Sequence, residues 1–219
     1  MKKKIFSVFA VLLFTGISAF SQKKVSELTL VYDASISSGA SAQPKLADAF
    51  DGTTTTIYIK GMMSRSEMSS ALASFVTIHD ARTGAATVLQ EISGQKLLIR
   101  MTAENWQEKN RRYEGVTFIP GTETKVIAGY KCRQALATMK DGSTFSVFFT
   151  DEIVPENAEY SAQFRNLEGI PLEYELTQGK LKIKYTVSRI TLNPVPASKF
   201  DIPKTGYREL TYEESRKKM

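Results

Sequence analysis

The chain has 219 residues, of which 42% are hydrophobic, and it carries 29 basic against 23 acidic residues for a net charge of +6. Apart from three lysines near the N-terminus, its basic residues are scattered, and the longest other run, Arg216–Lys218, lies at the end of the sequence. Nothing resembles the basic stripe of a nucleic-acid-binding protein. A single cysteine, Cys132, excludes an internal disulfide, and stability must therefore come from a hydrophobic core.

Residues 1–21 have the pattern of an export signal. Three lysines at positions 2–4 precede the apolar run Ile5–Phe14, which is too short to span a bilayer, and Ala19 and Ser21 supply the small residues of a cleavage site. We therefore expect an exported protein that begins at Gln22 and resides in the periplasm or at the outer-membrane surface. No later segment is long and apolar enough to anchor it in a membrane.

Alternation of apolar and polar residues predicts about ten strands in the rest of the chain. In Val25–Ile36, for example, Leu28, Leu30 and Tyr32 share one face. The other single strands expected from this pattern are Thr53–Lys60, Met62–Ser70, Ser74–Asp80, Val116–Ile119 and Thr122–Ile127. Hairpins of two strands are expected over Ala86–Met101, Tyr130–Asp151 and Gly169–Leu192.

Two segments are predicted to be helical. Thr102 is a suitable N-cap for a short amphipathic helix that ends near Tyr113, and Trp106 anchors this helix to the sheet. The second helix is expected over Pro155–Phe164, with proline at its first position.

Three hairpin turns can be placed from their sequences. A turn at Gln178-Gly179 sets Leu176 opposite Leu181 and Glu175 opposite Lys182, which gives one apolar and one charged face. Ser93-Gly94 and Gly94-Gln95 are both candidates for the next turn, and Gly94-Gln95 is preferred as a type II′ turn that pairs Ile92 with Leu97. Asp141-Gly142 is expected as a type I′ turn that sets Leu136 opposite Val147. Further along, the apolar pattern changes phase at Ser188-Arg189, which predicts a bulge.

These elements, without any βαβ rhythm, predict a mainly β (α+β) protein. We expect one curved antiparallel sheet or an open half-barrel, with two or three short helices on one face. Residues 22–205 are expected to form a single domain, and residues 206–219 a charged C-terminal tail.

No residue pattern indicates catalysis. His79 is the only histidine, and neither Cys132 nor any serine is marked as a nucleophile beside it, so a structural role near a strand end is expected. No cofactor is expected. Met62, Met63 and Met68 form the one unusual cluster, which suits either apolar packing or, as an alternative, binding of Cu(I).

Four stretches carry a resemblance to known proteins: the signal that ends at Ser21-Gln22, GTETKVIAGYKCRQA (Gly121–Ala135), the run Gly169–Leu172, and FDIPKTGY (Phe200–Tyr207). They resemble a family of secreted Gram-negative envelope proteins of unknown function, similar to those named for a GLPGLI motif. The resemblance implies a fold like that of the periplasmic lipoprotein carriers, a curved sheet whose concave face can receive acyl chains. It carries over no functional residue.

The leading hypothesis is a non-enzymatic envelope protein that binds a lipid, a lipidated protein or another apolar ligand in the concave face of the sheet, because the one-sided apolar strand surface exceeds what the few helices can cover. The alternative is an interaction or assembly scaffold with a self-filled core. Oligomeric state is left open. The candidate ligand-binding residues are Tyr174, Tyr185, Phe145, Phe149, Met62, Met63 and Trp106.

Overall fold

The structure is a computed structural model that describes residues 22–42, 44–70 and 73–217. The predicted export signal lies outside the described residues. The strands are β1 (Lys23–Val25), β2 (Glu27–Ser38), β3 (Thr54–Lys60), β4 (Met63–Ser69), β5 (Ala73–Asp80), β6 (Ala86–Ile92), β7 (Gln95–Met101), β8 (Thr117–Ile127), β9 (Tyr130–Thr138), β10 (Thr144–Thr150), β11 (Ile153–Pro155), β12 (Ile170–Gln178), β13 (Leu181–Thr191) and β14 (Arg208–Leu210). The helices are α1 (Pro44–Phe50), α2 (Ala103–Lys109) and α3 (Tyr212–Lys217), with 3-10 turns η1 (Ala40–Ala42), η2 (Arg111–Tyr113), η3 (Ala158–Tyr160), η4 (Ala162–Phe164) and η5 (Ala197–Phe200).

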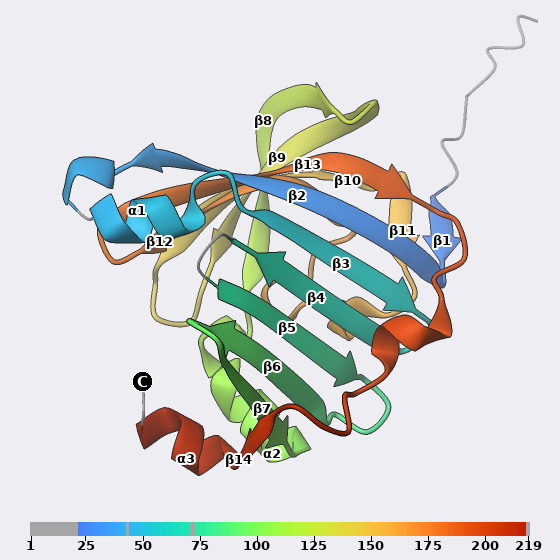
Figure 1. The fold of residues 1–219 in the computed structure, drawn as a ribbon. Coiled ribbons are helices and arrows are strands. Elements are labelled where there is room, and N and C mark those ends of the chain that lie inside the picture. Colours follow the sequence, from blue (N-terminus) through green and yellow to red (C-terminus); the bar gives the residue numbers. More distant parts are fainter. Residues whose placement is uncertain (1–21, 43, 71–72, 218–219) are drawn as a thin grey trace, which may run out of the picture.

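A single large, curved sheet dominates the described part of the chain (Figure 1). Its twelve strands follow the order β14-β7-β6-β5-β4-β3-β2-β13-β12-β10-β9-β8, and the sheet does not close on itself. All neighbours are antiparallel except β14, which runs parallel to β7. A small parallel pair, β1 and β11, lies apart from it. The prediction of a mainly β protein with an open, curved sheet is confirmed.

The alternation in β2 determines which face of the sheet is buried. Leu28, Leu30 and Tyr32 are completely buried, and they lie in one core cluster with residues of β9, β10, β12 and η4. This face is the inside of the curve and is called the concave face below, and the opposite face is called the convex face. The predicted bulge in β13 is also present, as a register shift between Val187 and Arg189.

The turn predicted at Gln178-Gly179 is wrong by one residue. Leu176 lies opposite Ile183, and Gln178 opposite Leu181, so the two central residues of the turn are Gly179 and Lys180. Gly179 has a φ of 62°, which suits the first central position of a type II′ turn. The register differs from the prediction by two residues, and this shift leaves every side chain on the expected face.

The preferred forms of the other two predicted turns are also wrong, although Ser93-Gly94, the alternative at the first, is the turn that forms. At the β6–β7 hairpin, Ser93 (φ 50°) and Gly94 (φ 80°) both adopt left-handed conformations, so the turn is of type I′ and Ile92 pairs with Gln95. At the β9–β10 hairpin, the Met139 N–H donates to the Ser143 carbonyl across a three-residue loop. This loop shifts the register by one residue, which leaves Leu136 45% exposed.

The helical segments are shorter than predicted. Thr102 caps α2 as expected, through a capping box with Asn105, but α2 ends at Lys109 and a 3-10 turn, η2, follows. The single helix expected over residues 155–164 is wrong. Ser161 is extended (φ −147°, ψ 115°) and separates the two 3-10 turns η3 and η4.

Each face of the sheet is covered by a different part of the chain. On the convex face, Phe200, Ile202 and Tyr207 of the segment before β14 pack against a buried cluster formed by β5, β6 and β7. The Arg65 side chain donates to the Lys199 carbonyl at 2.9 Å and holds this segment in place. The residues predicted as a charged tail form β14 and α3, where Leu210 and Tyr212 are buried. None of the helices in the described ranges is long and apolar enough to cross a membrane.

Candidate ligand-binding site

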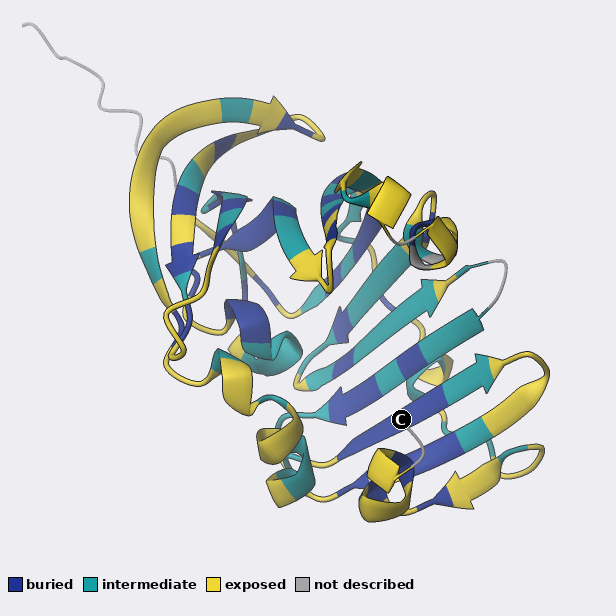
Figure 2. Cartoon of the chain, turned by 90° about the vertical axis from the view of Figure 1, so that its left-hand side faces the viewer, coloured by how far each residue is buried: buried dark blue, intermediate teal, exposed yellow. Residues whose placement is uncertain are grey.

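The concave face is filled at its two ends and partly open between them. At one end lies the core cluster that contains Tyr32, and at the other a smaller cluster in which Trp106 of α2 packs near Val88 and Ile99. The residues between the clusters are only partly buried, and they appear as the intermediate colour on β3, β4 and β5 in Figure 2.

This open stretch is called the concave stripe. Strand register places its members on one face, because Thr55, Met68, Phe75, Gln90 and Leu97 follow one another across five strands. A second row, Ile57, Ser66 and Thr77, lies beside the first. All eight side chains are partly exposed, and four of them are apolar. The sequence pattern of each strand showed this face, but not which part of it would stay uncovered.

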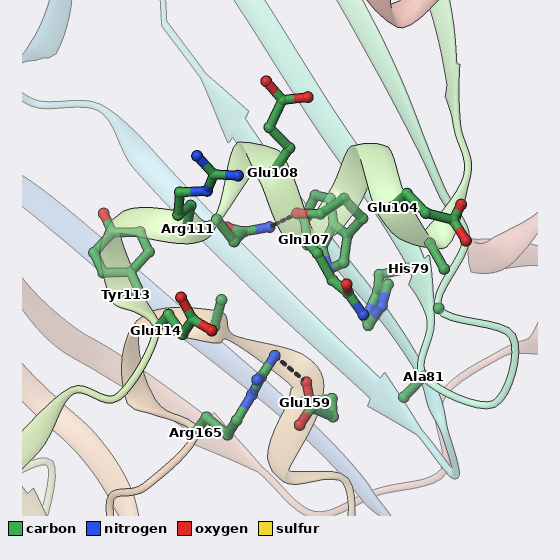
Figure 3. A pocket seen from close by; sticks show the side chains of 15 residues that line it. His79, Ala81, Glu104, Gln107, Glu108, Arg111, Tyr113, Glu114, Glu159 and Arg165 are labelled. Carbon is green, nitrogen blue, oxygen red and sulfur yellow. Dashed lines mark hydrogen bonds and ion pairs between the residues drawn. The ribbon is translucent and has the colours of Figure 1, made fainter. Parts of the chain in front are cut away.

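A cavity of about 650 Å³ lies at the end of β5, two residues beyond Thr77 of the stripe. It lies between α2 and η2 on one side and η3 and η4 on the other, with the end of β5 as its floor (Figure 3). Its wall contains aromatic, basic and acidic side chains. Those that matter for its chemistry are His79, Trp106, Arg111, Tyr113, Glu159 and Arg165.

His79 and Trp106 form the inner wall of this cavity. Their rings stack with centroids 5.0 Å apart and an interplanar angle of 25°. His79 is 4% exposed, and its Nδ1 atom has no hydrogen-bond partner among the described residues. Burial lowers the pKa of His79 below its usual value, although the nearby carboxylates of Glu159 and Asp80 oppose this shift.

Most of the charged groups in the cavity wall already have partners. Arg165 Nη2 and Glu159 Oε2 form an ion pair at 2.5 Å. Glu108 pairs with Arg216 of α3 at 2.5 Å. Glu114 pairs with Lys140 at 3.4 Å.

A second cavity of about 560 Å³ lies at the far end of the stripe. It is bounded by Leu97 and Ile99 of β7, by Gln90 of β6, and by Leu210 and Ser215 near the C-terminus. Leu97 belongs to both the stripe and this cavity. The stripe therefore has a polar cavity at the β5 end and a more apolar one beside α3.

The structure does not bring the seven predicted ligand-binding residues together. Tyr174, Tyr185, Phe145 and Phe149 are at most 9% exposed and belong to the core cluster, where the rings of Tyr174 and Tyr185 stack 5.0 Å apart. Trp106 lines the 650 Å³ cavity.

The methionines are separated as well. Met62 is 37% exposed, in the turn between β3 and β4. Met63 packs against the cluster on the convex face, whereas Met68 is part of the concave stripe. Because Met63 and Met68 lie on opposite faces of one strand, the three thioethers do not form a common metal site.

Sequence reasoning missed the cavity residues Arg111, Glu159 and Arg165. These residues meet only in the folded chain, and each looks like an ordinary surface charge in the sequence. One local signal was available, because His79 shares a strand face with Phe75 and Thr77.

Comparison with known proteins extends the description of the fold only. No family model and no curated protein matches the chain. The structure of PNGF-II is similar to that of this chain, with a TM-score of 0.54 and 10% identity. The alignment covers 89% of this chain but only 33% of the PNGF-II chain, so this chain spans about a third of the length of PNGF-II. An uncharacterized conserved protein from Thermus thermophilus aligns over 85% of this chain and 90% of its own, with 7% identity and a TM-score of 0.47. LprF from Mycobacterium bovis aligns over 78% of this chain and 88% of its own, with 9% identity and a TM-score of 0.29. At these identities the likeness to PNGF-II concerns the fold alone, and the other two are too distant to support an argument.

Proposed function

We propose that this chain is a non-enzymatic binding protein of the cell envelope that holds an apolar or amphipathic ligand on the concave stripe. The observation that carries the proposal is the stripe itself. Ile57, Met68, Phe75 and Leu97 remain partly exposed on the inside of a curved sheet whose two ends are filled. Partly exposed apolar side chains in a concave surface are typical of a small-molecule site.

The size of this apolar surface limits what it can bind. Full burial of one such side chain gains roughly 1.5–3 kcal/mol, so covering four half-buried side chains gains roughly 3–6 kcal/mol. Loss of translational and rotational freedom on association costs at least about 4 kcal/mol. The stripe alone therefore supports only weak binding, and a ligand held firmly needs further contacts in an adjoining cavity.

A pair of variants on neighbouring residues tests the proposal. Phe75 and Ser74 are both partly buried residues of β5, but they point to opposite faces of the sheet. Phe75→Lys places a charge in the concave stripe, and Ser74→Lys places the same charge on the convex face, opposite Glu91. We expect the first variant to lose binding of a fluorescent fatty-acid probe and the second to keep it, with both still folded by circular dichroism.

A scaffold with a self-filled core is the second candidate. The packing of Tyr174, Tyr185, Phe145 and Phe149 into the core favours it, because these residues leave no room for a ligand at their end of the sheet. The same titration separates the two functions. Wild-type protein that binds no probe supports the scaffold, and equal binding by both lysine variants removes the stripe from the site.

A further inference from the structure

Strand β5 carries part of the concave stripe and leads from it to the polar cavity. Phe75, Thr77 and His79 alternate on the same face of this strand, Phe75 and Thr77 within the stripe and His79 in the cavity wall. At about 3.3 Å per residue, the four steps along the strand from Phe75 to His79 span about 13 Å. A molecule with an extended chain and a polar end can therefore lie along β5 with its polar end beside His79.

Three of the four carboxylates in the cavity wall are offset by basic side chains. The carboxylates of Glu108, Glu114 and Glu159 are each paired with a basic side chain. Glu104, which also lines the cavity, is hydrogen-bonded to Thr102 at the start of α2, and this bond lowers its pKa. Glu104 is therefore ionised, but it lies at the start of α2, seven residues before Arg111, so an anion is favoured only at the Arg111 end of the cavity.

Arg111 is the basic residue of the cavity wall that lacks a carboxylate partner among the described residues. It lies on η2, whereas Arg165 lies at the end of η4, on the other side of the cavity (Figure 3). A guanidinium group is well suited to bind a planar anion through paired hydrogen bonds. Because only one such charge is unpaired, it matches a monoanion better than a phosphate monoester, whose charge is close to −2 at neutral pH.

His79 provides an independent indication that the cavity is built for a polar group. Its side chain is almost completely buried, yet its Nδ1 atom has no partner in the described structure. Buried polar atoms of this kind are rare because each costs free energy. An anion beside the ring would favour the form in which Nδ1 carries a proton and donates a hydrogen bond.

We propose that this cavity binds the carboxylate of a single-chain amphipathic acid whose hydrocarbon chain lies along the concave stripe. Arg111 is the principal contact for the carboxylate, with Arg165 and His79 on the opposite and inner walls. This inference rests on the proposed function, since it assigns the polar end of the same ligand.

The test compares dodecanoate with dodecanol, which have equally long chains but differ in the charge of the head group. Titration calorimetry on wild-type protein should show dodecanoate binding about tenfold more tightly, the effect of one charge-assisted hydrogen bond. Arg111→Gln should remove this preference and leave dodecanol binding unchanged. Arg112→Gln is the matched control, because Arg112 is the next residue, stacks on Tyr113 and does not line the cavity.

Each outcome distinguishes the carboxylate site from the proposed function. Equal affinities of wild-type protein for dodecanoate and dodecanol overturn the carboxylate site and leave the apolar ligand in place. A preference that Arg112→Gln removes as fully as Arg111→Gln overturns it too, because it then reflects overall charge. Protein that binds neither compound overturns the proposed function itself. Acetate serves as a third probe, and binding as tight as that of dodecanoate would show that the chain does not lie on the stripe.

Discussion

The hydroxyl of Tyr32 donates a hydrogen bond of 2.8 Å to the carbonyl oxygen of Pro171. These residues belong to β2 and β12, which are separated in the sheet by β13. The bond therefore spans the concave side of three strands at the point where the sheet curves. Tyr32 is completely buried, and its ring packs edge-on against Tyr174 at 5.6 Å. Burial raises the pKa of Tyr32 well above its usual value, so the hydroxyl remains a donor at all ordinary pH values.

Loss of this hydroxyl should destabilise the protein. In Tyr32→Phe, the buried Pro171 carbonyl loses its side-chain donor, and we expect the free energy of unfolding to fall by about 1–2 kcal/mol. Tyr185→Phe is the matched control, since Tyr185 stacks in the same core without a side-chain hydrogen bond to the described residues. Urea unfolding followed by circular dichroism measures both. Equal losses in the two variants would show that the bond itself contributes nothing.

Gly169 is required by the close approach of another strand. It precedes β12 with a φ of 149°, and a Cβ atom at this position would lie 2.1 Å from the Thr150 carbonyl oxygen. We expect Gly169→Ala to destabilise the fold by about 3 kcal/mol or more, because conformational strain adds to this backbone clash. Gly206→Ala should cost only about 1–2 kcal/mol. Gly206 also has a positive φ, of 84°, but open space surrounds it. Thermal and urea melts of the two variants compare the effects, and similar losses would contradict the role of the contact.

The thiol of Cys132 should be unreactive toward thiol reagents in the folded protein. It is 1% exposed, and burial raises the pKa of its thiol to about 11. The thiolate, which is the reactive form, is therefore scarce at pH 8. We expect a disulfide reagent such as DTNB to react slowly with native protein and at once after unfolding in guanidinium chloride. Rapid stoichiometric reaction of the native protein would show that this part of β9 opens or is exposed.

The elements that were predicted well are those with one dominant local cause. In β2 the alternation of Leu28, Leu30 and Tyr32 leaves only one way to bury the apolar face, and the structure follows it. The N-cap at Thr102 likewise follows from the chemistry of a single residue.

The turns were predicted poorly because two overlapping dipeptides can each form the central pair of the same turn. In the β12–β13 hairpin, Gln178-Gly179 and Gly179-Lys180 give registers that differ by two residues and bury the same faces. Face matching cannot distinguish them, and the left-handed conformation of Gly179 decides the outcome. Glu175 still pairs with Lys182, at 3.6 Å, but diagonally and not directly across the hairpin.

The site depends on long-range packing, which the sequence pattern does not contain. His79 and Trp106 are brought together when α2 folds back over β5, and Arg165 directly follows the segment that was predicted to be one continuous helix. Most of the apolar side chains that the sequence suggested as cavity lining are buried in the core cluster. Tyr174 and Tyr185 stack on each other and close the space they were expected to line. Partly exposed Phe75 and Met68 mark the stretch where packing is incomplete.

His79 should titrate below the usual range for histidine. Its burial disfavours the charged ring more than the carboxylates of Glu159 and Asp80 favour it, so its pKa is lowered in the folded state. Because His79 is the only histidine, its ring protons give isolated NMR signals in protein whose purification tag has been removed. A titration of these signals should give a pKa below the value of about 6.5 found for unfolded chains.

The lowered pKa of His79 also determines how the stability of the protein depends on pH. The neutral ring stabilises the fold above about pH 6.5, and this contribution is lost as the pH falls through the lowered pKa. We therefore expect the free energy of unfolding to decrease between pH 7.5 and pH 5, and to decrease less in His79→Phe, which keeps an aromatic ring against Trp106 but cannot be protonated. A pKa at or above 6.5 in the folded protein, or an identical pH dependence in the variant, would contradict the burial of a neutral ring in this cavity.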